Sequence, residues 1–239
     1  MIAALLRVMR WRLAVLLLAA VLFYIGDPGL HDHTGEVDDV GELLAPTGLS
    51  FTVANMAALS MVVLLAGFIS ADRRRGYYRL AFSHPTRPLA FYALRWGMAL
   101  ALSMALAAAF LVVSQLAAWG TMRVGFSFLL QGFLLAVAYG GIVAFFSALM
   151  PRGEGFVAVG LFFLTDLWLT LLAEAPTPPF APATRALVSF ILPPHTAVSD
   201  VYTGLLSGVV AWGGVAYAIG YGLFWLALAA LLVRVREWP

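Results

Sequence analysis

Long apolar runs separated by short polar connections dominate this chain. A helix needs about 20 mostly apolar residues to cross the hydrocarbon core of a membrane, and six runs fit that pattern. The pattern therefore predicts an all-α integral membrane protein that forms a single transmembrane domain over residues 1–239. The predicted spans are residues 11–26, 49–71, 96–119, 127–150, 156–173 and 207–233.

The distribution of charge predicts how these spans are oriented. With six spans, both termini lie on one side, and that side receives all of the 14 basic residues except Arg123 and Arg185. Cytoplasmic segments carry such an excess of arginine, so we expect cytoplasmic N- and C-termini. The first outer connection is rich in acidic residues, which agrees with this orientation. No small-residue cleavage site follows the first apolar run, so we expect an uncleaved first span.

The connection between the fifth and sixth spans differs from the others. Its short apolar run, residues 186–192, cannot cross a membrane and is bracketed by prolines, which interrupt helices. We expect a short helix or a re-entrant segment at the outer surface. Gly204 and Gly208 form a small-residue pair that allows close helix packing at the start of the last span.

Composition narrows the class of protein further. Hydrophobic residues make up 63% of the chain and charged residues 11%, against about 25% charged in an ordinary soluble domain. The chain contains no cysteine, which excludes disulfides and thiolate chemistry. It also contains no lysine, which excludes a phosphate-binding loop of the GxxxxGK[ST] type and a lysine Schiff base.

The stretch "ADRRRGYYRLAFSHPTRPLA", residues 71–90, gathers five of the basic residues between two apolar runs. Asp72 favours the start of a helix and can reach Arg75 one turn later. Pro85 ends that helix, because a residue before proline disfavours the α conformation. Thr86 and Pro88 then suit the start of a new helix. We expect a cytoplasmic elbow over residues 72–95, which binds either anionic lipid or a soluble partner.

The layout resembles the type-2 permease subunits of ATP-binding cassette transporters. Those permeases carry an acidic residue, a basic residue, a glycine, a short apolar helix and "P-x-R" between spans two and three. The corresponding residues here are Asp72, Arg73, Gly76, Leu80, "SHPTR" at 83–87, and Arg95. The "LPPHTAVSD" turn at 192–200 and the basic tail "VRVREWP" also match the family pattern. Family members usually have glutamate in place of Asp72 and a longer amphipathic N-terminal helix.

The resemblance implies a permease of the prokaryotic cytoplasmic (inner) membrane, an exporter that works as a homodimer or with a related permease. Energy would come from separate ATPase subunits, which bind ATP and Mg, while this chain binds no cofactor. Membrane lipid is the other expected partner, and no nucleic acid is expected. The coupling contacts would come from Asp72, Arg73, Arg74, Arg75, Gly76, Tyr77, Tyr78, Arg79, Leu80, Phe82, His84, Pro85 and Arg87.

Polar residues within the spans are candidates for a translocation path. Asp166 is the one acidic residue deep in a predicted span, where a carboxylate is costly and faces a cavity, a partner or a hydrogen bond. Asn55, Gln115 and Gln131 fit a path or interhelical hydrogen bonding equally well. No span contains a complete catalytic motif.

Two outer clusters suggest other chemistry. His31, Asp32 and His33 form a weak candidate for a divalent-metal site, with solvation of an acidic loop as the simpler interpretation. His195, Ser199 and Asp200 contain the residue types of a hydrolase. Two alternatives to a permease therefore stay open, a membrane-embedded enzyme acting on lipid or peptide and a non-transporting anchor for a soluble partner.

Overall fold

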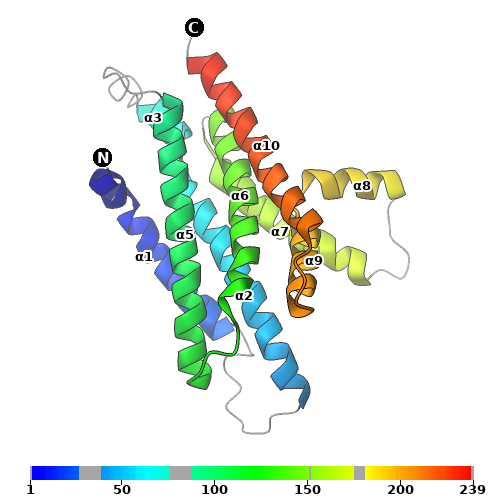
Figure 1. The fold of residues 1–239 in the computed structure, drawn as a ribbon. Coiled ribbons are helices and arrows are strands. Elements are labelled where there is room, and N and C mark those ends of the chain that lie inside the picture. The colour runs from blue at the N-terminus through cyan, green and yellow to red at the C-terminus, as the bar shows by residue number, and fades with distance from the viewer. Residues whose placement is uncertain (1, 27–38, 76–87, 151, 175–180, 238–239) are drawn as a thin grey trace.

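The computed structural model describes residues 2–26, 39–75, 88–150, 152–174 and 181–237 (Figure 1). The described part is all-helical and contains no β-strand, as the sequence predicts. The helices are α1 (Ile2–Gly26), α2 (Asp39–Leu65), α3 (Ser70–Arg75), α5 (Pro88–Trp119), the short 3-10 helix η2 (Phe126–Phe128), α6 (Leu129–Leu149), α7 (Glu154–Glu174), α8 (Pro182–Ile191), α9 (His195–Leu206) and α10 (Trp212–Glu237).

Four helical stretches of the described part are long and apolar enough to cross a membrane: Gly48–Arg73, Pro88–Trp119, Phe126–Leu149 and Trp212–Val235. They correspond to the second, third, fourth and sixth predicted spans. The first and fifth predicted spans fall within α1 and α7, and their crossing of the membrane stays a prediction. The structure is therefore that of a membrane protein with at least these four candidate spans.

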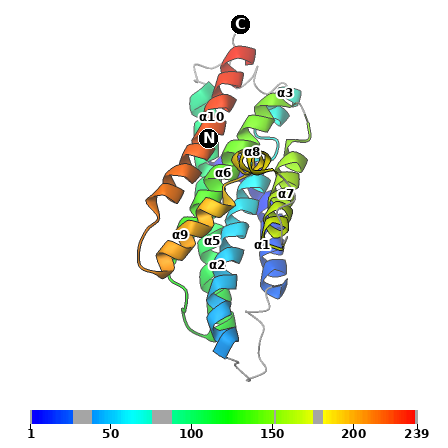
Figure 2. The same cartoon turned by 90° about the vertical axis from the view of Figure 1, so that its right-hand side faces the viewer.

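Helix α6 lies at the centre of the bundle, with α2 on one side and α10 on another (Figures 1 and 2). It is apolar around its whole circumference, which is typical of a helix that is buried on every side. Leu134, Tyr139 and Val143 are completely buried along it. In contrast, large apolar side chains such as Phe156 of α7 and Trp212 of α10 are exposed, which suits an exterior that faces lipid.

Two glycines bring the backbones of α6 and α10 into direct contact. A Cβ added at Gly141 would overlap the backbone of Gly222, and one added at Gly222 would lie 2.6 Å from the carbonyl oxygen of Val137. Only a residue without a side chain permits this approach. These positions therefore set the spacing of the central helix pair.

The second predicted span, residues 49–71, is not one continuous helix. Helix α2 ends at Leu65, and a turn follows in which Gly67 has a φ of 71°. That conformation is unfavourable for residues with a side chain and interrupts the helical hydrogen bonding. Helix α3 then begins at Ser70, with Asp72 in its first turn as predicted. This bend is the base of the expected elbow.

The third predicted span starts earlier than residue 96, because α5 begins at Pro88. Proline at the first turn of this helix confirms the predicted start signal. The rest of the elbow lies outside the described residues, and so do the following coupling candidates: Gly76, Tyr77, Tyr78, Arg79, Leu80, Phe82, His84, Pro85 and Arg87.

The segment before the last helix holds two short helices rather than one. The predicted apolar run falls in α8, which lies across the direction of the main bundle (Figure 1). Pro193 and Pro194 separate α8 from α9. The last predicted span, residues 207–233, begins later, because Gly208 (φ 75°) is in the turn that precedes α10. Gly204 lies in the last turn of α9 and Gly208 in the turn that follows it, so neither is at the start of a span.

Candidate functional site

The bend between α2 and α3 is held by side chains from other helices. The backbone N–H groups of Ile69 and Ser70 donate hydrogen bonds to the Ser147 hydroxyl on α6, at 2.8 and 3.1 Å. Both residues of the bend and Ser147 are buried. Buried N–H groups at a helix break need such partners, because leaving them unpaired costs free energy. The end of α6 therefore supplies the hydrogen-bond acceptor for two buried N–H groups of the bend.

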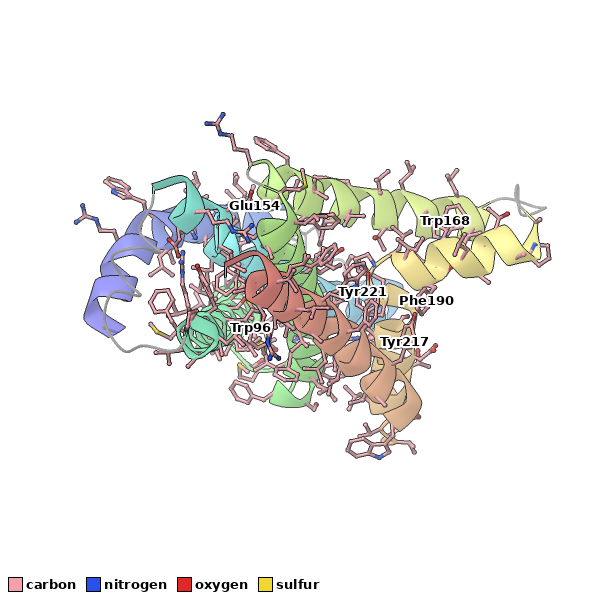
Figure 3. The ribbon with its side chains drawn as sticks, turned by 90° about the horizontal axis from the view of Figure 1, so that it is seen from above. Trp96, Glu154, Trp168, Phe190, Tyr217 and Tyr221 are labelled. Carbon is pink, nitrogen blue, oxygen red and sulfur yellow. The ribbon has the colours of Figure 1, made fainter. Side chains whose placement is uncertain are left out.

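Glu154 attaches the start of α7 to the same bend. Its Oε1 accepts hydrogen bonds from the backbone N–H of Gly67 (2.7 Å) and from the Ser70 hydroxyl (2.5 Å). The side chain is only 4% exposed and lies in the first turn of its helix, beside the bend (Figure 3). A carboxylate is favoured at that position by the helix dipole. The bend is therefore hydrogen-bonded directly to the start of α7.

Arg95 of α5 joins the bend to α3. Its Nη1 lies 2.7 Å from Oδ2 of Asp72 and 2.9 Å from the carbonyl oxygen of Phe68. The guanidinium carbon also lies 5.5 Å from the centre of the Phe68 ring. Only 8% of the Arg95 side chain and 18% of the Asp72 side chain are exposed. Ion pairs with this little exposure are much less screened by salt than surface pairs.

Two further arginines donate hydrogen bonds to backbone carbonyl groups near the bend. Arg12 of α1 donates to the carbonyl oxygen of Leu64 at 2.5 Å, and Arg73 of α3 donates to the carbonyl oxygen of Ala148 at 2.6 Å. The base of the elbow is thus bonded to α1, α5, α6 and α7. We call this set the junction network, and its side-chain members are Arg12, Ser70, Asp72, Arg73, Arg95, Ser147 and Glu154. Its hydrogen bonds and its ion pair run between helices, an arrangement that suits mechanical linkage.

The sequence identified part of this site. Asp72 and Arg73 were predicted to contribute, and Arg74 and Arg75 lie in α3 with side chains outside the described set. The structure pairs Asp72 with Arg95, and the expected contact of Asp72 with Arg75 stays a prediction.

Four members of the junction network were not predicted from the sequence: Arg12, Ser70, Ser147 and Glu154. A usable signal existed for Glu154, since an acidic residue at the start of an apolar helix needs a partner or a polar surface. The other three give no sequence signal, because serines are frequent within spans and arginines are frequent at their cytoplasmic ends.

The three amide candidates for a translocation path have different surroundings. Gln115 is fully buried, and its Oε1 accepts from the backbone N–H groups of Arg123 (2.7 Å) and Val124 (2.6 Å). It thus shapes the loop after α5, and its role in a path stays a prediction. Asn55 and Gln131 are each less than 9% exposed, and each has a buried side-chain oxygen with no hydrogen-bond partner in the described structure. Gln131 also lines a cavity.

The remaining candidates are less defined. Asp166 lies within α7, but its side chain is outside the described set. His31, Asp32 and His33 lie outside the described residues altogether. The structure therefore adds nothing to the metal-site and acid-path hypotheses, which stay predictions.

His195 begins α9 and contacts the centre of α6. Its Nε2 lies 3.0 Å from the hydroxyl of the fully buried Tyr139, and the two rings meet edge to face. One of its two ring nitrogens is thus within hydrogen-bond distance of a tyrosine. Burial lowers the pKa of His195 to about 4, so the imidazole is neutral near neutral pH. This residue lies outside the four candidate membrane-spanning stretches.

The lowered pKa of His195 predicts a specific acid sensitivity. The unfolded chain, with a histidine pKa near 6.5, binds this proton more readily than the folded chain. Stability should therefore fall as the pH drops from about 6.5 towards 4, by up to about 3 kcal/mol at ~1.4 kcal/mol per pH unit. Denaturant titrations of detergent-solubilised protein at several pH values measure this slope. We expect His195→Gln to flatten it.

Tyr139→Phe is the matched control for that measurement. It removes the hydroxyl contact but leaves the imidazole buried, so the pH slope should persist because burial causes the pKa shift. An equal slope in wild type and His195→Gln would contradict the assignment of the acid sensitivity to this histidine.

Comparison of the chain with protein-family models, with curated proteins and with solved structures finds no match.

Proposed function

We propose that this chain is the membrane-spanning subunit of an ATP-driven transporter, an exporter that works as a dimer. In this proposal it takes its energy from separate ATPase subunits that dock on the elbow between the second and third predicted spans. The absence of lysine supports ATP hydrolysis by a separate subunit, because this chain cannot build the usual phosphate-binding loop.

The junction network is the observation that carries the proposal. The base of the elbow is bonded to α5 through the Asp72–Arg95 pair, to α6 through Ser147 and to α7 through Glu154. Closely packed elements transmit displacement rather than absorb it. A force applied to α3 would thus reach three helices of the bundle at once. A simple anchor would need an exposed docking surface but no such linkage.

Purification of the full chain from its native membrane tests the proposal. We expect an ATPase subunit with a phosphate-binding loop to co-purify, identified by mass spectrometry, and its ATP hydrolysis in liposomes to depend on the permease. Gly76→Ala and Arg87→Ala should each weaken docking by roughly tenfold, about 1.4 kcal/mol.

Arg152→Ala is the matched control, because this exposed arginine lies on the predicted cytoplasmic side but outside the elbow. Purification without any ATPase would overturn the proposal and favour a membrane-embedded enzyme. An ATPase that stays bound and fully stimulated by the elbow variants would overturn the assignment of the elbow.

A further inference from the structure

A cavity of about 610 Å3 lies between α2, α6, α7 and α9. It lies beside the first turns of α6, through Gln131 and Leu135, whereas the junction network binds the last turn of the same helix. Its volume falls within the range of about 300–1,000 Å3 that is typical of small-molecule sites. The cavity is therefore large enough for a ligand and separate from the elbow.

The lining of the cavity has an apolar wall and a polar edge. Phe51 of α2, Leu135 of α6 and Leu169 of α7 contribute to the wall. The edge includes Gln131 of α6 and Ser199 of α9, together with the neutral imidazole of His195. Small-molecule sites commonly combine apolar walls with a few placed polar groups that orient the ligand.

Gln131 gives the strongest indication that a ligand binds at this edge. The residue is only 6% exposed, yet its Oε1 has no hydrogen-bond partner in the described structure. A buried acceptor without a partner costs free energy. The Oε1 of Gln131 is closed off from the cavity in this conformation, and a rotation of the amide into the cavity would let a ligand that donates a hydrogen bond recover that cost. The cavity thus favours a molecule with an O–H or N–H group at one end.

The charge of the lining restricts the ligand further. Among the described lining residues no arginine, aspartate or glutamate is present, and burial keeps His195 neutral. A charged group moved from water into such a cavity loses its hydration and gains no counter-charge. The described lining therefore disfavours carboxylates, phosphates and ammonium groups.

We infer that this cavity binds an uncharged amphiphile whose polar end carries a hydroxyl or amide hydrogen-bond donor, such as a fatty alcohol or a monoacylglycerol. The apolar tail lies against Phe51, Leu135 and Leu169, and the donor reaches Gln131. The identification of this amphiphile as a transported substrate rests on the proposed function, but the binding itself does not.

Photolabelling of the full chain in lipid nanodiscs, without ATP or any ATPase, tests the inference. The probes are a diazirine-bearing fatty alcohol and the matching fatty acid and fatty amine of equal chain length. Peptide mapping by mass spectrometry should locate the alcohol on α2, α6 and α9, with roughly tenfold less labelling there by either charged probe.

Three variants separate a specific site from general lipid contact. Ser199→Trp places a large side chain in the cavity from the exposed side of α9, and it should reduce cavity labelling by roughly tenfold. Gln131→Leu keeps a similar shape but removes the acceptor, and it should reduce labelling by about fivefold while the protein stays folded. Ser189→Trp on α8, which does not line the cavity, should leave labelling unchanged.

Equal labelling by the three probes, a preference for the amine, or labelling unaffected by Ser199→Trp would overturn the inference. A cavity that holds only water would give this last result. Because the experiment contains no ATPase, its failure leaves the transporter proposal intact. Conversely, selective binding of the alcohol together with no co-purifying ATPase would overturn the transporter proposal alone.

Discussion

Replacement of Arg95 by glutamine is expected to destabilise the protein by about 3 kcal/mol. Glutamine leaves the Asp72 carboxylate, which is 18% exposed, without its charged partner and removes the donor to the carbonyl oxygen of Phe68. Breaking a buried ion pair costs about 3–5 kcal/mol, and the residual exposure of Asp72 places this case at the lower end. Denaturant titration of the detergent-solubilised protein, followed by circular dichroism, measures the loss.

A double-mutant cycle shows whether the pair itself is responsible. Asp72→Asn combined with Arg95→Gln removes both charges, so the combined loss should be smaller than the sum of the two single losses. Arg152→Gln, at an exposed arginine of the same predicted face, should change stability by less than about 0.5 kcal/mol. Additive losses at Asp72 and Arg95 would show that the pair contributes nothing specific.

Alanine at Gly222 is expected to destabilise the protein by about 1–3 kcal/mol, because the methyl group enters the contact between α6 and α10. Its Cβ would lie 2.6 Å from the carbonyl oxygen and 2.7 Å from a side-chain methyl of Val137. The backbone of α6 cannot yield there without moving the central helix of the bundle. The same titration measures the loss.

Gly220→Ala provides the control on the same helix. Nothing lies within 4 Å of a Cβ at that position, and alanine is the better helix former by about 0.5–1 kcal/mol. The two substitutions should therefore have opposite signs. A stabilising effect of alanine at both positions would show that α6 and α10 do not approach as closely as the structure indicates.

Local signals account for what the sequence predicted well. The apolar runs located the helices, and Pro88 located the start of α5, because both effects act within one segment of chain. The break at Gly67 was not predicted, since the surrounding residues are apolar and favour continuation of the helix. Its conformation depends on Glu154 and Ser147, which are distant in sequence.

The residues of the candidate site also divide into those recognisable from local sequence and those that depend on contacts between distant segments. Asp72 and Arg73 were recognisable from their density of charge within one connection. The contact of Asp72 with Arg75 stays a prediction, and the pairing of Asp72 with Arg95 was not predicted, because Arg95 reaches Asp72 only after α5 packs beside the bend. Gln131 was recognised as polar in a span, but its unpaired oxygen and the cavity beside it result from the packing of four helices.

The bend after α2 has a consequence for biosynthesis. Its N–H groups donate hydrogen bonds to Ser147 and Glu154, which are synthesised 77 to 87 residues later than the groups they bind. Contacts of such long sequence separation form late in folding. We therefore expect these N–H groups to lack their final partners until residues 147–154 have been synthesised, so a chain truncated before residue 147 should be more sensitive to proteolysis at this bend.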